Sequence, residues 1–243
     1  MLHASPIPGL LISGTDTGIG KTLIAGAIAA HLRRQGIRVG VLKPAASGCA
    51  HRREGLVSED AEFLAHCADA PHPLDLIAPQ RFAEPLAPAI AAERMRTTLD
   101  WDAIQRSIDF IARDSDVVII EGVGGIMVPM DAKHTMLDVA LWLKLPAVVV
   151  ARPNLGTINH TLLTVNALRD ADVKVAGVVV NRYPAEMPGV AEETNPGAIE
   201  KWGKVPVLCI VPDVKEAIGL RMPEDVAAAV ATVDWAGLAG VRT

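Results

Sequence analysis

One short segment, GTDTGIGKT at residues 14–22, constrains the fold more than any other part of the chain. It follows an apolar run at residues 10–13 and precedes a stretch of good helix formers, LIAGAIAAHLRR, at residues 23–34. A strand, a glycine-rich turn that ends in Gly-Lys-Thr and a helix, in this order, are typical of a phosphate-binding loop. Five residues separate Gly14 from Gly20 here, whereas the common pattern has four. The segment therefore predicts a nucleotide-binding loop of a variant type.

Short apolar runs recur along the chain and alternate with helix-like stretches. The runs are rich in Val, Ile and Leu and show no apolar–polar alternation, which is typical of parallel strands buried on both faces. We expect strands at residues 10–13, 39–43, 117–120, 147–151, 175–180 and 205–211, and helices at 20–35, 59–67, 100–113, 135–144, 156–170, within 189–203 and near 223–232. This order predicts one α/β domain over residues 1–243, with a doubly wound, mostly parallel sheet and helices on both faces, of the P-loop NTPase type.

The segment 71–93 is rich in proline and fits no regular element well. It is the longest expected excursion from the sheet. It is either a solvated connection or a loop that reaches a functional site, since long loops in compact domains often carry function.

Composition and charge argue against several classes of protein. The net charge is −5 and there is no basic run, so the chain shows no electrostatic footprint for nucleic acid. The three cysteines, Cys49, Cys67 and Cys209, match no zinc or redox spacing. The N-terminus has no signal-peptide pattern, and no apolar run reaches the ~20 residues of a membrane span. We therefore expect a soluble, cytoplasmic protein without a nucleic-acid or membrane partner.

Polar residues after the apolar runs are the candidates for function, because ligands of doubly wound sheets bind beyond the carboxyl ends of the strands. Lys21 is expected at the β- and γ-phosphates of a nucleotide and Thr22 at Mg²⁺. Lys43 closes the second run. It either joins Lys21 in phosphoryl transfer or is an ordinary exposed lysine at a strand end. Glu121 closes the third run and resembles a Walker-B ligand of Mg²⁺ more than a charge emerging into solvent.

Other candidate positions are ambiguous on the residues alone. Asp60 lies in the first turn of an expected helix, where an acidic residue is favoured whatever its function. Asn159 and His160 begin another helix, where they either help to bind an anion or simply cap and pack. Asn181 and the pair Pro212-Asp213 close the fifth and sixth runs, and they form either a nucleotide-base pocket or ordinary turns.

Six segments together resemble the dethiobiotin synthetase family in order and spacing. They are GTDTGIGKT, KPAASG, FAEPLAPAIAAE, IEGVGG, NLGTINH and VVVNR, within residues 9–214. The Thr-Asp-Thr that lengthens the loop is itself a feature of that family. The resemblance implies an ATP- and Mg²⁺-dependent ligase of biotin biosynthesis, which closes the ureido ring of dethiobiotin from 7,8-diaminononanoate and CO₂ through a phosphorylated carbamate.

The resemblance also implies residue roles. Lys21 and Lys43 would neutralise charge on the phosphates and the carbamate, beside which Ser47 would donate a hydrogen bond. The ligands of Mg²⁺ would be Thr22, Asp60 and Glu121. The nucleotide would be bound by Thr17, Gly18, Ile19, Gly20, Lys21, Thr22, Asp60, Glu121, Gly122, Val123, Gly124, Asn181, Arg182, Pro212, Asp213 and Val214. Family members are homodimers, and the substrate carboxylate would bind the partner's helix N-terminus, here Leu155, Gly156, Thr157 and Asn159.

The chain departs from the family at two positions and differs from related classes of protein. Gly18 stands where several relatives carry Glu, and Asn195 falls near a substrate-contacting Tyr of the family. Partition-type ATPase switches carry a lysine at the position of Asp16, and cobyrinate-type amide synthases carry a glutaminase domain for which 243 residues leave no room. A module that binds ATP without turning it over is the non-enzymatic alternative.

Overall fold

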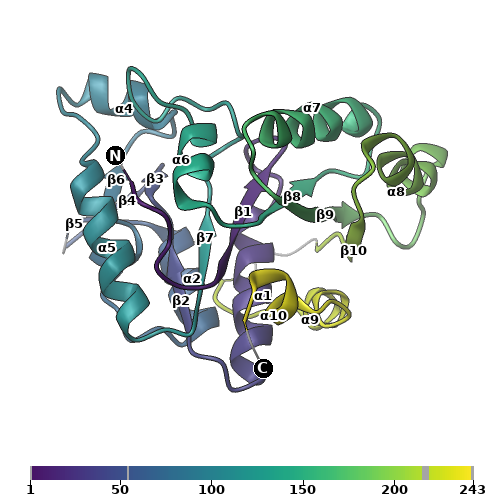
Figure 1. Cartoon of the computed structure of the whole chain (residues 1–243), viewed down its shortest axis with the longest axis horizontal. Helices are drawn as coiled ribbons and strands as arrows, with labels where there is room; N and C mark the ends of the chain where they lie inside the picture. Colours follow the sequence, from purple (N-terminus) through teal and green to yellow (C-terminus); the bar gives the residue numbers. More distant parts are fainter. Residues whose placement is uncertain (1, 54, 215–218, 242–243) are drawn as a thin grey trace.

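The computed structural model describes residues 2–53, 55–214 and 219–241. Its centre is a parallel sheet with the strand order β10-β9-β8-β1-β7-β2 (Figure 1). These strands are β1 (Gly9–Gly14), β2 (Val39–Leu42), β7 (Val117–Glu121), β8 (Ala147–Ala151), β9 (Val175–Tyr183) and β10 (Val207–Pro212). The predicted doubly wound α/β fold is confirmed.

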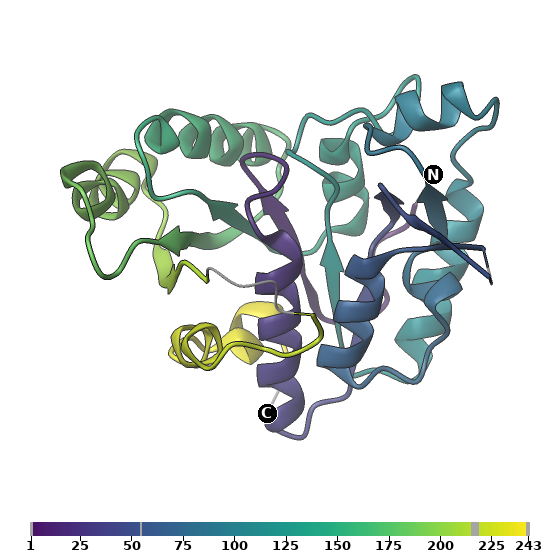
Figure 2. The same ribbon diagram turned by 180° about the vertical axis from the view of Figure 1, so that it is seen from behind.

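Helices cover both faces of the sheet, as two opposite views show (Figures 1 and 2). One face carries α5 (Trp101–Arg113), α6 (Met136–Leu143), α7 (Thr157–Asp170) and α8 (Val190–Gly203), and the other carries α1 (Lys21–Arg34), α2 (Glu59–Ala68), α9 (Glu224–Val230) and α10 (Trp235–Ala239). Within β1, Leu11 belongs to one hydrophobic cluster, while Leu10 and Ile12 belong to the other. Burial on both faces explains why the strands read as continuous apolar runs.

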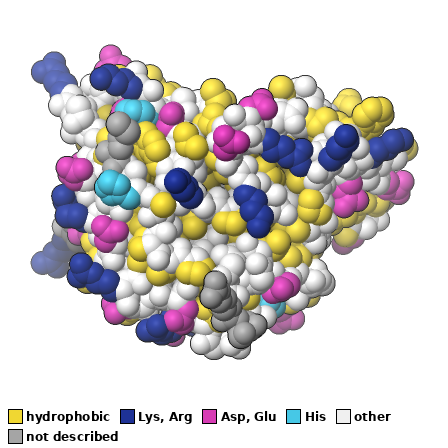
Figure 3. Space-filling view, in the orientation of Figure 1, with side chains coloured by type: hydrophobic (Ala, Val, Ile, Leu, Met, Phe, Trp, Pro, Cys, Tyr) yellow, Lys and Arg dark blue, Asp and Glu magenta, His cyan; other side chains and the backbone are white. Residues whose placement is uncertain are grey.

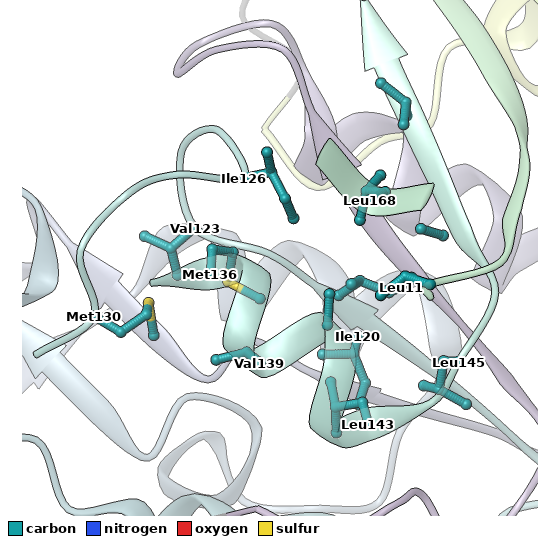
Figure 4. Packing of buried hydrophobic residues seen from close by; sticks show 14 of the residues in the cluster. Leu11, Ile120, Val123, Ile126, Met130, Met136, Val139, Leu143, Leu145 and Leu168 are labelled. Atoms are coloured by element: carbon teal, nitrogen blue, oxygen red, sulfur yellow. The ribbon is translucent and has the colours of Figure 1, made fainter. Parts of the chain in front are cut away.

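The loop after β7 is anchored in the core (Figure 4). Val123, Ile126 and Met130 from this loop are buried against Met136 and Val139 of α6. The buried side chains of this loop hold the glycines between them beside the phosphate-binding loop. The two loops approach each other closely, since a Cβ on Gly124 would lie 3.3 Å from Thr17 Oγ1.

Between β2 and α5 the chain forms short elements that local patterns did not reveal. They are β3 (Ala45–Ser47), β4 (Ala50–Arg52), β5 (Gly55–Val57), α3 (Leu74–Ile77), β6 (Gln80–Phe82) and α4 (Pro88–Arg94). The expectation that 71–93 lacks regular structure was therefore wrong. β6 forms by parallel pairing with the distant β3, and Pro88 opens α4 at a position where proline is favoured. Among the described residues, none of the helices combines the length and apolar character of a membrane span.

Candidate active site

The phosphate-binding loop joins β1 to α1, and its last glycine has a special conformation. Gly20 caps α1 with φ 90°, in the left-handed region. A Cβ at this position would lie 2.2 Å from Asn181 Nδ2. Among the described residues no side chain caps α1, and its first turn contains no acidic residue. Its free N–H groups and the positive end of the helix dipole therefore face the loop, as anion binding requires.

A cavity of about 460 Å³ opens at this loop. It is lined by Thr17, Gly18, Gly20, Lys21, Thr22, Lys43, Ser47, Asp60, Pro85, Leu86, Ala87, Glu121, Val123, Gly124, Val128 and Arg182. The turn before α4 thus reaches the site, which favours the functional interpretation of the segment 71–93. Val128 also lines the cavity, in a turn of the loop after β7 where its backbone N–H donates to the oxygen of Gly125 at 3.1 Å.

Lys21 is buried beside the loop backbone. Its Nζ donates a hydrogen bond to the backbone oxygen of Asp16 at 2.8 Å. Burial lowers the pKa of Lys21 to about 8; the attraction of Glu121 opposes this shift, and the repulsion of Lys43 adds to it. A bound phosphate would favour the charged form of this lysine, because an opposite charge nearby stabilises it.

Lys43 is held between two carboxylates and does not extend into solvent. The residue is 7% exposed. Its Nζ donates to Glu121 Oε1 at 2.9 Å and also to Asp60 Oδ2. The hydroxyl of Thr22 lies against the same carboxylates, 2.8 Å from Glu121 Oε1 and 3.1 Å from Asp60 Oδ1. Four side chains from α1, α2 and the ends of β2 and β7 therefore form one cluster.

The charges in this cluster depend on one another. Burial would lower the pKa of Lys43, but the attraction of Glu121 and Asp60 outweighs it and the pKa is raised. Burial opposes the ionisation of Asp60, yet Lys43 holds the pKa of that carboxyl below its usual value. Burial raises the pKa of Glu121 in spite of Lys43. Lys43 thus compensates negative charge that would otherwise be enclosed without a partner.

The second oxygen of Glu121 suggests that the cluster receives a further group. Glu121 is 1% exposed, and its Oε2 is buried without a hydrogen-bond partner among the described residues. Mg²⁺ in nucleotide sites takes one or two carboxylates and completes its shell with phosphates and water. No group of three or more His, Cys, Asp or Glu suited to a metal occurs in the described part of the chain. Asp60 and Glu121 offer the one or two carboxylates that Mg²⁺ takes in nucleotide sites.

Asn181 supports the phosphate-binding loop from outside the cavity. Its Nδ2 donates to the backbone oxygen of Ile19 at 2.7 Å, while its buried Oδ1 has no partner among the described residues. The next residue, Arg182, has φ 61° and lines the cavity. The structure thus brings the end of β9 against the loop, as the strand-end argument expects.

The other predicted nucleotide residues lie near this edge but do not line the cavity. Pro212 ends β10 and pairs with Tyr183, and the backbone N–H of Asp213 donates to the oxygen of Tyr183 at 2.8 Å. Val214 packs against the core on the α1 side of the sheet. Gly122 continues β7, and its N–H donates to the backbone oxygen of Ile12 at 2.9 Å.

The residues predicted to bind the substrate tail begin α7 at the surface, away from the cavity lining. Leu155 is 89% exposed, and Gly156 caps the helix with φ 94°. Thr157, the first residue of the helix, is buried, whereas Asn159 is exposed.

Asn195 holds the turn before α7. Its Nδ2 donates to the backbone oxygens of Pro153 at 2.7 Å and Asn154 at 3.2 Å, and the residue is 4% exposed. Arg152, which precedes Pro153, connects the same turn to the phosphate-binding loop: its guanidinium donates to Asp16 Oδ2 at 2.8 Å. Neither contact has a local sequence signal, because each joins segments that are far apart in the chain.

Comparison with known proteins identifies the family. A family model described as "AAA domain" matches residues 8–219. The ATP-dependent dethiobiotin synthetase BioD of Thermodesulfovibrio yellowstonii is 36% identical, covering 86% of this chain and 90% of that protein. The ATP-dependent dethiobiotin synthetase BioD of Bacillus licheniformis is 39% identical, covering 86% of this chain and 87% of that protein. The chain belongs to the dethiobiotin synthetase family. The recognition based on its motifs is confirmed.

Solved structures show how widely this fold is shared. The MinD cell division protein of Aquifex aeolicus superposes with a TM-score of 0.56 at 16% identity, covering 93% of this chain and 94% of that one. A ParA family ATPase of Chlorobium tepidum superposes with a TM-score of 0.56 at 16% identity, covering 96% of this chain and 98% of that one. At this identity the likeness concerns the fold alone. This chain therefore shares its fold with MinD and with a ParA family ATPase.

Proposed function

We propose that this protein is an ATP-dependent ligase that closes the ureido ring of dethiobiotin from 7,8-diaminononanoate and CO₂, in the biotin biosynthesis of the cytoplasm. The observation that carries the proposal is the cavity in which Lys21 and Lys43 meet the acidic pair Asp60 and Glu121 beside a phosphate-binding loop. Phosphoryl transfer requires mainly positioning and charge stabilisation, which this set of groups supplies. The family supplies the identity of the substrate.

The proposed reaction makes and breaks bonds in three steps. One amine nitrogen of the substrate bonds to the carbon of CO₂ and loses a proton, which gives a carbamate. A carbamate oxygen takes the γ-phosphoryl group of ATP, and ADP leaves. The second amine attacks the carbamoyl carbon, expels inorganic phosphate and loses a proton, which closes the ring.

The residues of the cavity fit these steps. Lys21 would stabilise charge on the β- and γ-phosphates, and Lys43 would do so where the carbamate meets the γ-phosphate. The hydroxyl of Ser47, at the cavity wall, would donate a hydrogen bond to the carbamate. No histidine is among the described residues that line the cavity. Phosphate oxygens within reach of the amines would accept their protons.

Thr22, Asp60 and Glu121 would hold Mg²⁺. Two observations support this assignment: the Oε2 of Glu121 has no partner in the described part of the chain, and the carboxylates of Asp60 and Glu121 converge on Lys43. When bound, the ion supplies positive charge to the phosphate oxygens.

The remaining nucleotide contacts belong to four short segments of the chain. Residues 17–20 and 122–124 would surround the phosphates, and Arg182 would extend toward them from the end of β9. The Oδ1 of Asn181, which has no hydrogen-bond partner among the described residues, supports a place for the base at the ends of β9 and β10, with residues 212–214 closing the pocket.

We further propose that the protein acts as a homodimer. Exposed hydrophobic residues gather on and around α7 and α8: Leu155, Leu163, Met187, Val190 and Trp202. Hydrophobic side chains reach the surface at the end of the molecule where α8 lies (Figure 3). A second copy that covers this face would bring residues 155–159 of one chain to the substrate tail in the other.

A phosphate-release assay tests the proposed function. Purified protein would be supplied with Mg-ATP, bicarbonate and 7,8-diaminononanoate, and inorganic phosphate would be measured with each component omitted in turn. We expect release to require the diamine. Phosphate release that ignores the diamine would support an ATPase switch of the partition type, and ATP binding without turnover would support a non-enzymatic module.

A further inference from the structure

Lys43 has two incompatible tasks in the proposed function. Its ammonium group now neutralises Asp60 and Glu121, at hydrogen-bond distance from both. These carboxylates are also the groups that fit a divalent cation. During phosphoryl transfer, the same ammonium group would have to face the phosphate and the carbamate. A single ammonium cannot occupy the cation position and stabilise the transferred group at the same time.

We propose that Lys43 is a built-in counter-ion, which occupies the divalent-cation position between Asp60 and Glu121 until nucleotide and cation enter together. The cation then replaces the ammonium group, and Lys43 turns toward the phosphates. The inference rests on the proposed function, because it concerns the same site.

The charge of the cavity supports this exchange. Among the described residues that line the cavity, three cationic side chains, Lys21, Lys43 and Arg182, face the two carboxylates of Asp60 and Glu121, so negative charge is already fully compensated. A divalent cation alone would bring two positive charges beside two ammonium groups in a poorly solvated place, which is unfavourable. A cation that arrives with ATP brings more negative than positive charge, and each lysine then gains a phosphate partner. Binding of the cation therefore becomes coupled to binding of the nucleotide.

The geometry allows the movement. Lys43 lines the same cavity as the phosphate-binding loop, so its ammonium group can leave the carboxylates without leaving the site. The lysine side chain has a flexible four-carbon stem, which suits a short swing. Glu121 is anchored at the end of a buried strand and offers Oε2 in addition to the Oε1 that Lys43 contacts. The carboxylate can therefore accept a cation with little movement of its own.

Lys43→Met tests the proposal through cation binding without nucleotide. Binding of Mn²⁺ would be followed by electron paramagnetic resonance, and binding of Mg²⁺ by calorimetry. We expect the variant to bind the cation at least about tenfold more tightly than the wild type, and its coupling to a non-hydrolysable ATP analogue to fall by a similar factor. An unchanged cation affinity in the variant would overturn the proposal.

Lys21→Met is the matched control. It removes the same charge from the same cavity, but the Nζ of Lys21 donates to a backbone oxygen and to neither carboxylate. We expect its gain in cation affinity to be much smaller than that of Lys43→Met. Equal gains in both variants would show a general effect of charge and would contradict a specific exchange.

A measurement on the wild type covers the case in which Lys43→Met does not fold. Crystals with and without Mg²⁺ and the ATP analogue would be compared. We expect the Nζ of Lys43 to lie 2.9 Å from Glu121 Oε1 without ligands and beyond hydrogen-bond distance with them. Retention of that contact beside a bound cation would refute the exchange. None of these measurements needs the diamine. A negative result here can therefore be distinguished from a negative result in the phosphate-release assay.

Discussion

At the scale of single residues, the glycine before Lys21 decides whether the loop keeps its shape. Gly20→Ala would place a Cβ 2.2 Å from Asn181 Nδ2 at φ 90°. The left-handed conformation alone costs a residue with a side chain about 1–2 kcal/mol. The collision adds to this cost and pushes Asn181 from the loop. We expect ATP affinity, measured by calorimetry, to fall at least about tenfold, and the midpoint of thermal unfolding to drop by several degrees.

Gly36→Ala provides the control for this prediction. Gly36 has φ 83°, but apart from its own chain neighbours no described residue has an atom within 4 Å of a Cβ built there. This variant should lose stability through backbone strain and keep its affinity for ATP. A similar loss of ATP affinity in both variants would show that strain, and not the contact with Asn181, governs the loop.

Lys43 should matter more for turnover than for binding of ATP. Its ammonium group contacts Asp60 and Glu121, and no hydrogen bond to the phosphate-binding loop is recorded among the described residues. We expect Lys43→Ala to lower kcat about 100-fold or more, as removal of a group that stabilises transition-state charge does. The Kd for ATP, measured by calorimetry, should change far less. Equal losses in kcat and ATP affinity would assign Lys43 to ground-state binding of phosphate.

At the scale of elements, the side chain of Asn195 joins α8 to the turn that precedes α7. It holds the turn before α7, on which the proposed tail site is built. Asn195→Ala removes the donor to the backbone oxygen of Pro153 and leaves that of Asn154 with the N–H of Thr157, so the turn before α7 should lose its orientation. We expect the KM for 7,8-diaminononanoate to rise about tenfold, with smaller changes in kcat and in the KM for ATP, as steady-state kinetics would show.

Two comparisons separate positioning by Asn195 from a general loss of structure. Thr194→Ala removes the neighbouring side chain on α8, whose hydroxyl donates within its own helix, to the backbone oxygens of Val190 and Ala191. Its KM for the diamine should match that of the wild type. A methyl ester of the substrate lacks the carboxylate, and Asn195→Ala should not alter its KM. An equal rise for acid and ester would contradict a role in recognising the tail.

The main elements could be predicted because each carries its own local pattern. β1, β7 and β8 are buried on both faces, so a continuous apolar run identifies them. β6 could not be found in this way, because its three residues form a strand only by pairing with β3. The site follows the same division. Lys43 and Glu121 were predicted from their strand ends, whereas the direct contact between them depends on the packing of β2 beside β7.

At the scale of the whole molecule, stability should fall in mild acid because of a buried histidine that does not line the cavity. His72 is 7% exposed, and neither ring nitrogen has a hydrogen-bond partner among the described residues. Its ring packs edge-on against Phe110 of α5 with centroids 6.1 Å apart. Burial lowers the pKa of His72, and Asp114, whose carboxylate lies 3.9 Å away, opposes this shift only partly.

The sign of the effect follows from proton linkage. Unfolded His72 takes up a proton near its ordinary pKa of about 6.5, whereas the folded state takes it up at lower pH. Between these values the unfolded state binds more protons, so the free energy of unfolding decreases as pH falls through this window. His72→Phe removes the proton-binding group and keeps an aromatic ring. Urea unfolding at pH 7.5 and 5.5 should show a smaller loss of stability in this variant than in the wild type. His51→Phe, at an exposed position of β4, should lose as much stability between pH 7.5 and 5.5 as the wild type does. If His72→Phe also loses as much stability as the wild type, burial of this ring does not couple protonation to folding.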